Sequence, residues 1–347
     1  MSFETADYLS WYVPRIRRED GALNLHASGV PALVPDELEV EGGNPWIQAT
    51  AFEAELAGWL GCSVKELVFT PGATGGTLLA LLTLAGSRVV VVESPIYEPM
   101  LRQAERLNPV RRLPRAAASG WRFDAADVAD VVRDDTALIL LTEPHNPSGA
   151  LTPPGEILEL AERAARHGAL LLINEVYRGW TDQPSYHGAA PNIVVVSSLS
   201  KLFGAYWARL GWLSGERSLI ERLRMAHLNF GMASAPNAAV GLAVLARADE
   251  LLHAARTRAH EGLAMVDAWI AGTPGLSWRR PDGTGFGCVR LPPGTDDVAL
   301  AERLHDEHGV LTVPGTLWDS PGTLRLSWLQ ASPDELRTAL DRISKVL

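Results

Sequence analysis

A single lysine, Lys201, stands where this chain could do covalent chemistry. It follows an apolar run predicted as a strand over residues 193–196, and Ser198, Ser200 and Arg209 lie close to it along the chain. A lysine at the end of a buried strand loses hydration, which lowers its pKa and leaves a neutral amine that can attack a carbonyl carbon. Serine hydroxyls and a guanidinium are suited to phosphate. A carbonyl and a phosphate in one ligand outline pyridoxal 5′-phosphate (PLP), although a surface lysine after a strand would give the same short pattern.

Small residues after an earlier strand could hold such a phosphate. Gly72, Ala73 and Thr74 precede a predicted helix over residues 78–85. Free backbone amides at a helix N-terminus favour an anion, and small side chains let it approach. The segment lacks the Gly-Lys-Ser/Thr ending of a nucleotide-binding P-loop, and a plain tight turn would have the same composition.

Aromatic and polar side chains follow further predicted strands. Tyr97 could stack on a flat heterocycle, and Asn146 and Tyr177 could both donate to a phenolate oxygen. Arg325 lies in an otherwise apolar strand. A buried arginine needs an anionic partner, which is either a structural carboxylate or the α-carboxylate of a substrate.

The first two thirds of the chain alternate between buried strands and helices. The clearest helix covers residues 153–167, with Thr152 as its N-cap and Gly168 just past its end. Near-continuous apolar runs predict strands over residues 88–92, 137–141, 169–173 and 193–196. This alternation predicts an α/β fold with a mostly parallel sheet between helices, in which ligands bind beyond the carboxyl ends of the strands.

The pattern changes to α+β after about residue 240. Helical periodicity continues to about residue 270, and shorter elements follow over residues 286–291, 296–308, 311–313, 323–327 and 333–347. We therefore expect a large PLP-binding domain over residues 46–240. A smaller α+β domain would be built from residues 1–45 and 241–347.

Composition narrows the partners. The 347 residues carry a net charge of −10, which disfavours nucleic acid and anionic membranes. No basic-then-apolar leader begins the sequence, and no apolar stretch reaches the ~18–20 residues that span a bilayer. Cys62 and Cys288 form neither a disulfide framework nor a metal-binding motif. These features predict a cytoplasmic protein with small-molecule partners and no metal.

In their order along the chain, these motifs resemble those of the fold type I PLP-dependent enzymes, the aspartate aminotransferase superfamily, and its class I and II branch in particular. The resemblance implies an aminotransferase that acts on an α-amino acid and a 2-oxo acid, with PLP held as a Schiff base on Lys201. It also implies that this lysine moves the proton from the substrate Cα, that Tyr177 is the second catalytic residue, and that the enzyme is a homodimer. Trp46 and residues 229–232 would then reach the neighbouring subunit's site.

The same resemblance assigns the remaining roles. It implies that the cofactor phosphate is bound by Gly72, Ala73, Thr74, Ser198 and Arg209. Tyr97 would stack on the cofactor ring, and Asn146 and Tyr177 would bind its phenolate oxygen. Arg325 would anchor the substrate carboxylate, with Asn146 also near the substrate.

One departure bears on the reaction. Asn174 stands where the family carries an aspartate that keeps the pyridine nitrogen protonated, so the ring is expected to be a weaker electron sink unless Glu175 or a water supports it. Elimination, cyclisation or epimerisation would tolerate that loss better than transamination. Ser28-Gly29-Val30 also resembles a segment of capreomycidine-synthase-like enzymes, which supports a lyase, cyclase or epimerase as the alternative.

The substrate itself is not named by the sequence. Five aromatic residues suggest an aromatic-lined pocket: Trp11, Trp46, Trp207, Phe230 and Trp318. Arg15, Arg17 and Arg18 could meet a distal carboxylate or form a solvated helix face.

Overall fold

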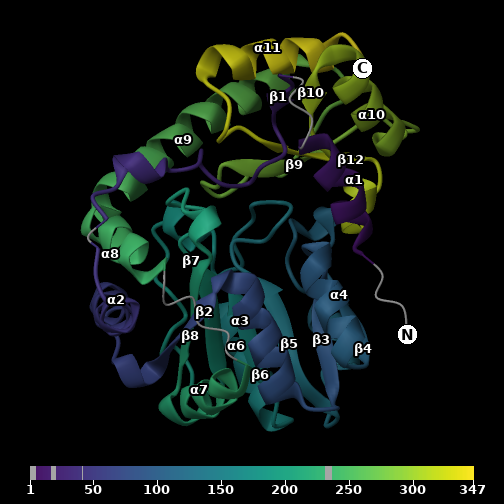
Figure 1. The fold of residues 1–347 in the computed structure, drawn as a ribbon. Coiled ribbons are helices and arrows are strands. Elements are labelled where there is room, and N and C mark those ends of the chain that lie inside the picture. Colours follow the sequence, from purple (N-terminus) through teal and green to yellow (C-terminus); the bar gives the residue numbers. More distant parts are fainter. Residues whose placement is uncertain (1–4, 17–20, 41, 231–236) are drawn as a thin grey trace.

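A seven-stranded sheet forms the centre of the computed structural model, which describes residues 5–16, 21–40, 42–230 and 237–347 (Figure 1). Its strand order is β2-β8-β7-β6-β5-β3-β4. The strands are β2 (Leu67–Pro71), β3 (Val89–Ser94), β4 (Val110–Pro114), β5 (Thr136–Thr142), β6 (Leu170–Asn174), β7 (Ile193–Ser198) and β8 (Leu210–Gly215). Only β8 runs antiparallel to its neighbours, so the predicted α/β fold with a mostly parallel sheet is confirmed.

Helices cover both faces of this sheet, which explains why its strands are apolar on both sides. Every residue of β5 and of β7 is buried. One apolar core joins the sheet to α3 (Gly72–Ala80), α4 (Glu98–Leu107) and α7 (Arg217–Phe230). A second core joins the opposite face to α5 (Ala125–Val131) and α6 (Pro154–Arg166).

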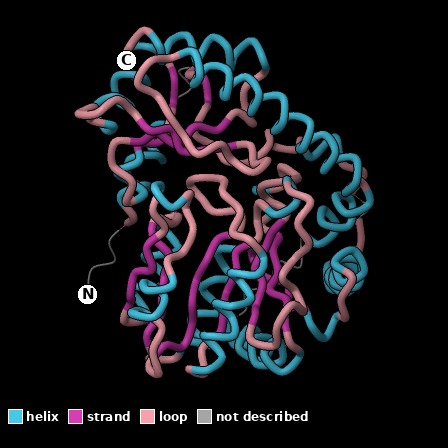
Figure 2. The backbone as a smooth tube through the Cα atoms, turned by 180° about the vertical axis from the view of Figure 1, so that it is seen from behind, coloured by secondary structure: helices cyan, strands magenta, loops and turns pink. Residues whose placement is uncertain are grey.

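A smaller sheet lies above the carboxyl ends of the large one (Figures 1 and 2). It is antiparallel, in the order β11-β12-β9. Its strands are β9 (Phe286–Arg290), β11 (Val313–Pro314) and β12 (Thr323–Ser327). Its apolar core is shared with three helices: α9 (Ala248–Gly272), α10 (Asp297–His308) and α11 (Pro333–Ser344).

The N-terminal part of the chain joins these two layers. The helix α1 (Asp7–Ile16) begins beside α4, where Glu98 accepts the backbone N–H of Tyr8 at 2.6 Å. The short strand β1 (Leu23–Asn24) pairs in parallel with β10 (Val310–Leu311). Further on, α2 (Pro45–Leu60) packs closely on α8 (Ala238–Ala246), because a Cβ on Gly241 would fall 2.4 Å from the Phe52 ring.

Several of the predicted helix and strand boundaries are wrong. Thr152 is not an N-cap: α6 begins after Pro153, and the Thr152 hydroxyl instead serves a buried ion cluster described below. The predicted strand 311–313 is two strands, because β10 pairs with β1 and β11 pairs with β12. The helix predicted over residues 78–85 already begins at Gly72, and residues 81–85 form a π-helical turn.

None of the helices in the described ranges is both long and apolar enough to cross a bilayer. The division into domains at residues 46 and 240 stays a prediction.

Candidate active site

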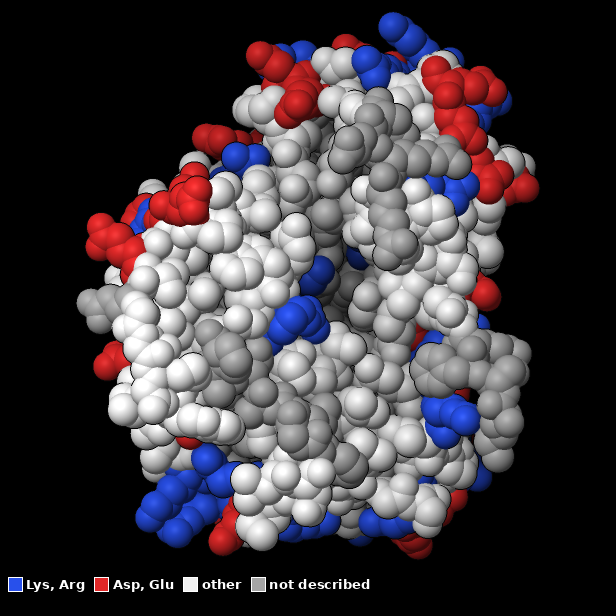
Figure 3. Space-filling view, viewed as in Figure 1, with Lys and Arg blue, Asp and Glu red and all other residues white. Residues whose placement is uncertain are grey.

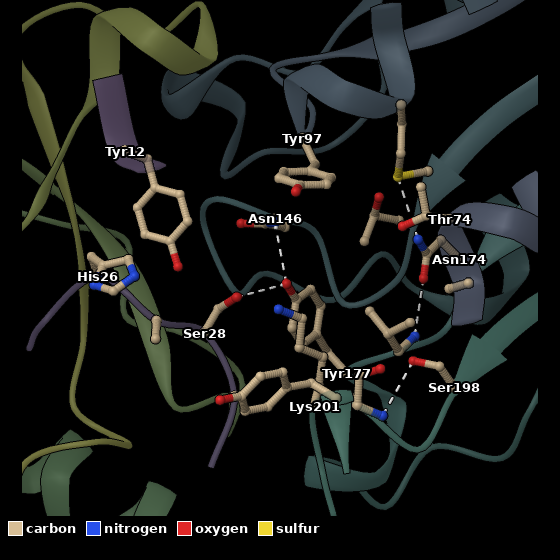
Figure 4. Close-up of a pocket in the computed structure, with 18 of the residues that line it drawn as sticks. Tyr12, His26, Ser28, Thr74, Tyr97, Asn146, Asn174, Tyr177, Ser198 and Lys201 are labelled. Atoms are coloured by element: carbon tan, nitrogen blue, oxygen red, sulfur yellow. Dashed lines mark hydrogen bonds between the residues drawn. The ribbon is translucent and has the colours of Figure 1, made fainter. Parts of the chain in front are cut away.

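A cavity of about 580 Å³ lies at the carboxyl ends of the parallel strands, beneath the small sheet (Figure 4). Nearly all of the site residues expected from the sequence meet in it. They are Ala73, Thr74, Tyr97, Asn146, Asn174, Tyr177, Ser198, Lys201, Arg209 and Arg325. Gly72 lies directly beside this wall, because a Cβ built on it would fall 2.7 Å from Nη2 of Arg209.

Lys201 follows β7 and is the only lysine of the pocket. The chain contains two others, Lys65 and Lys345, and both are exposed. Burial, reinforced by Arg325 and Arg209, lowers the pKa of Lys201 to about 8. The N-terminal segment confines it, since a Cβ on Gly29 would lie 3.3 Å from both Cα and Cδ of the lysine. The lysine is therefore held in place and has a neutral amine available near physiological pH.

Tyr177 presents its hydroxyl to the same space. That hydroxyl lies 2.9 Å from Oγ of Ser28, and Nδ2 of Asn146 donates to it at 3.4 Å. Burial raises the pKa of Tyr177, so it stays a neutral donor. Two donors from different loops thus converge on one point, as binding of a phenolate oxygen requires.

Arg325 is 2% exposed, and no carboxylate of the described residues is paired with it. Nη1 donates to Oδ1 of Asn146 at 3.2 Å, Nη2 donates to the carbonyl of His26, and Nε has no partner. The guanidinium also lies over the Trp318 ring, 4.6 Å from its centroid. A buried cation held only by neutral groups leaves room for an anionic ligand.

The opposite end of the cavity suits phosphate. The α3 N-terminus has no side-chain cap, so its first amides are free to bind an anion. Arg209 reaches this turn and donates to the Pro71 carbonyl at 3.3 Å. Figure 4 shows Thr74 and Ser198 at this end and His26 and Tyr12 at the other.

The amide of Asn174 is oriented by two contacts. Its Oδ1 accepts the backbone N–H of Val176 at 3.1 Å, and its Nδ2 donates to Sδ of Met100 at 3.3 Å. The amide nitrogen, rather than the oxygen, is thus turned toward the Met100 side of the pocket. Glu175 cannot substitute for it, because its carboxylate faces away and accepts from Ser185 and the Tyr186 backbone.

A buried ion cluster lies behind the loop that carries Asn146. Arg115 contacts Glu93 at 2.8 Å and Glu143 at 3.1 Å, and all three side chains are fully buried. Thr152 completes the cluster by accepting from Arg115 and donating to Glu143. Burial raises the pKa of Glu93 to about 7.

His145 joins the two loops that carry Tyr97 and Asn146. Its Nε2 lies 2.9 Å from the Pro95 carbonyl and its Nδ1 lies 2.7 Å from Oγ of Ser148. Burial holds the pKa of His145 well below its usual value, so the ring is neutral. It is a structural link between the loops.

The pocket is lined by aromatic residues, as the sequence suggested, but none of the four tryptophans named above lines it. The aromatic wall is made of tyrosines instead: Tyr8, Tyr12, Tyr97, Tyr177 and Tyr206. Trp46 is 72% exposed at the start of α2, so its role in a neighbouring subunit stays a prediction. Residues 231 and 232 and the Phe230 side chain lie outside the described part, as do Arg17 and Arg18, while Arg15 pairs with Glu302.

Sequence reasoning missed the N-terminal contribution to the site. Ser28 and His26 line the cavity, although the only signal in this segment was the resemblance of Ser28-Gly29-Val30 to capreomycidine-synthase-like enzymes. Gln330 was also missed. It lines the cavity and donates to the Gly29 carbonyl at 2.6 Å.

Known proteins of the same fold agree with this geometry. The family model described as aminotransferase class I and II matches residues 39–343. An arginine–pyruvate transaminase of Pseudomonas aeruginosa is 32% identical over 274 residues, which cover 75% of this chain and 68% of that protein. A capreomycidine synthase of Streptomyces vinaceus is 29% identical over 265 residues, covering 74% and 68%.

Among solved structures, a PLP-dependent aminotransferase of Streptococcus suis superposes with a TM-score of 0.89 at 25% identity, covering 100% of this chain and 98% of that one. A PLP-dependent cyclase reaches a TM-score of 0.85 at 22% identity, which shows the shared fold.

The chain therefore belongs to the class I and II aminotransferase family, within the fold type I PLP-dependent enzymes. It is a PLP-dependent aminotransferase. The site fits that cofactor: one lysine with a lowered pKa lies between an uncapped helix N-terminus, which can bind an anion, and an arginine with no acidic partner among the described residues.

Proposed function

We propose that this enzyme moves the amino group of an α-amino acid to a 2-oxo acid, with Lys201 as the catalytic residue. The observation that carries the proposal is an amine with a pKa of about 8 in a cavity whose two arginines pair with no carboxylate of the described residues. When bound, PLP supplies an electrophilic carbonyl carbon and a ring that withdraws electrons from the substrate Cα. Nζ of Lys201 holds the cofactor and, once released by substrate, takes the proton from Cα.

The other residues orient the reactants. Arg325 binds the α-carboxylate, and Asn146 holds Arg325 through its carbonyl oxygen. Arg209, Ser198 and the α3 N-terminus bind the phosphate, while Tyr97 lies on the wall where it can stack on the ring. The Tyr177 hydroxyl and the Asn146 amide donate to the phenolate oxygen.

Borohydride reduction of the PLP-loaded protein tests the central assignment. Peptide mass mapping should find the pyridoxyl adduct on Lys201 alone. Lys65 and Lys345 serve as internal controls because they are exposed and do not line the cavity. An adduct on either of them, with Lys201 unmodified, would overturn the proposal.

A second candidate reaction is favoured by Asn174. Its amide nitrogen can only donate to the pyridine nitrogen, which would leave the ring unprotonated and slow chemistry that depends on a long-lived carbanion. Elimination, cyclisation or epimerisation would suffer less. Asn174→Asp distinguishes the two: if it raises transamination by about 10- to 100-fold, as a charged hydrogen bond of ~1.5–3 kcal/mol would, the natural reaction is the second candidate. Unchanged or reduced turnover supports the aminotransferase.

We also propose a homodimer whose subunits share their sites. Large apolar side chains are exposed on α2 and α7, with Trp46 72%, Ile47 69%, Met225 61% and Leu228 70% exposed. An ion pair between Arg224 and Glu53 at 3.6 Å joins these two helices into one face, and the surface over α2 carries few charges in Figure 3. Sedimentation that finds a fully active monomer would rule the dimer out.

We also propose that the protein is located in the cytoplasm.

A further inference from the structure

His26 is a buried polar side chain whose ring has no hydrogen-bond partner. It is 2% exposed and lines the cavity, yet neither Nδ1 nor Nε2 meets a donor or acceptor in the described part of the chain. Burial, with Arg325 and Lys201 nearby, holds the pKa of His26 well below its usual value. The ring is therefore neutral, and it offers one donor and one acceptor to whatever enters the cavity.

The wall beside the His26 ring is aromatic on the side of α1. The Tyr12 ring centroid lies 4.4 Å from that of His26, and Tyr8 stacks on Tyr12 at 5.2 Å. Burial raises the pKa of both tyrosines, so their phenols stay neutral. Figure 4 places Tyr12 and His26 at the end of the cavity opposite the phosphate turn, where a substrate side chain would extend.

No carboxylate faces this space from the described residues, since neither Asp nor Glu is among those that line the cavity. The cations of the lining are Lys201, Arg209 and Arg325, and the proposed function already uses all three. Figure 3 shows basic side chains at the edge of the central hollow. A charged substrate side chain would lose its hydration there without gaining a counter-charge from the described residues of this chain.

We infer that the substrate side chain is uncharged, planar and equipped with a hydrogen-bonding atom that pairs with His26. This inference rests on the proposed function, because it takes Arg325 as the α-carboxylate anchor. The His26 carbonyl accepts from that same arginine, so His26 is in direct contact with the residue that we assign to the α-carboxylate. Phenol, indole, imidazole, urea and carboxamide groups meet these requirements. The guanidinium of arginine and the carboxylate of aspartate, the substrates named for two relatives, do not.

Binding of carboxylates that lack the amino group tests the inference without turnover. Calorimetry on the PLP-loaded enzyme would compare 5-ureidopentanoate with 5-guanidinopentanoate, glutaramate with glutarate, and 3-(4-hydroxyphenyl)propanoate with 3-phenylpropanoate. We expect the first member of each pair to bind about tenfold or more tightly, because a buried unpaired polar or charged group costs at least that much.

Variants of His26 locate the effect. His26→Phe keeps a planar ring but removes both nitrogens, and should reduce the hydroxyphenyl preference to less than about twofold. His26→Gln keeps a neutral donor and acceptor and should restore most of it. His253→Phe is the matched control, since His253 is exposed on α9 and does not line the cavity. Its preference should equal that of the unchanged enzyme.

Two outcomes would overturn the inference. One is tighter binding of guanidinopentanoate or glutarate, which would place a counter-charge at the far end of the cavity. The other is a hydroxyphenyl preference that persists in His26→Phe. Failure of the proposed function gives a different result: no carboxylate of any pair would bind competitively with an amino acid, and no amino acid would change the cofactor absorbance.

Discussion

Arg115 and Arg325 are both 2% exposed, but their surroundings differ completely. Arg115 is enclosed by Glu93, Glu143 and Thr152, so the protein itself supplies all of its partners. Among the described residues, Arg325 donates only to neutral acceptors, and its Nε has none. Because burying an unpaired charge is costly, we expect an anionic ligand to complete the second arrangement. The comparison therefore contrasts an ion cluster completed by folding with a site that, in our proposal, its substrate completes.

The largest effect is expected for Lys201→Ala, which changes the cavity that Arg325 also lines. Amino transfer should fall roughly 10⁴-fold, because both the covalent attachment and the proton transfer depend on Nζ. The midpoint of urea unfolding of the cofactor-free protein should not fall, since a buried amine is removed. Lys65→Ala, at an exposed position, should leave both quantities unchanged.

Arg115→Met, in contrast, should lower the stability of the fold. It leaves two buried carboxylates without a cation, and we expect the free energy of unfolding to fall by about 3–5 kcal/mol. Arg337→Met is the control, because its ion pair with Asp334 is exposed and should contribute less than about 1 kcal/mol. Equal urea midpoints for the two variants would mean that the Arg115 cluster does not stabilise the fold.

Arg325→Ala sharpens the comparison between the two arginines. The value of kcat/KM should fall roughly 100-fold, mainly through KM, because a charge-assisted pair with the α-carboxylate is lost. The cofactor absorbance should remain. Arg290→Ala, an exposed arginine on the neighbouring strand β9, should show wild-type kinetics. Loss of the cofactor with amino-acid affinity intact would contradict the role given to Arg325.

A smaller effect is expected from pH. The pKa of Lys201 is lowered to about 8, so its amine is mostly neutral above that value and mostly protonated below it. Capture of PLP by the cofactor-free protein should therefore rise about fivefold from pH 7 to pH 8 and level off above about pH 9. Stopped-flow absorbance would measure this. A rate that keeps rising tenfold per pH unit to pH 10 would indicate an ordinary lysine.

The parts of the site that the sequence predicted are rare residue types at the ends of apolar runs. Lys201 and Arg325 belong to this group, because a charge in a buried strand is conspicuous without any knowledge of neighbours. The parallel sheet was predictable for the same reason, since β5 and β7 are continuously apolar.

The parts that were missed depend on contacts between distant segments. His26 and Ser28 reach the cavity because β1 pairs with β10, about 285 residues further along the chain, and no local periodicity encodes that pairing. The strand β8 escaped prediction because Leu210–Gly215 contains two glycines, which are unfavourable in strands. The roles of Thr152 and Glu143 required knowing that Arg115 lies between them.

The N-terminal segment that confines Lys201 is fastened to the far end of the chain. Ser327 donates its hydroxyl to the Ala27 carbonyl at 2.7 Å, and Gln330 donates to that of Gly29. The wall of the cavity that confines Lys201 is therefore completed only once residues 327 and 330 have been synthesised, after Lys201 and all strands of the large sheet. A growing chain thus carries its buried lysine before it carries Arg325, to which we assign the α-carboxylate of the substrate.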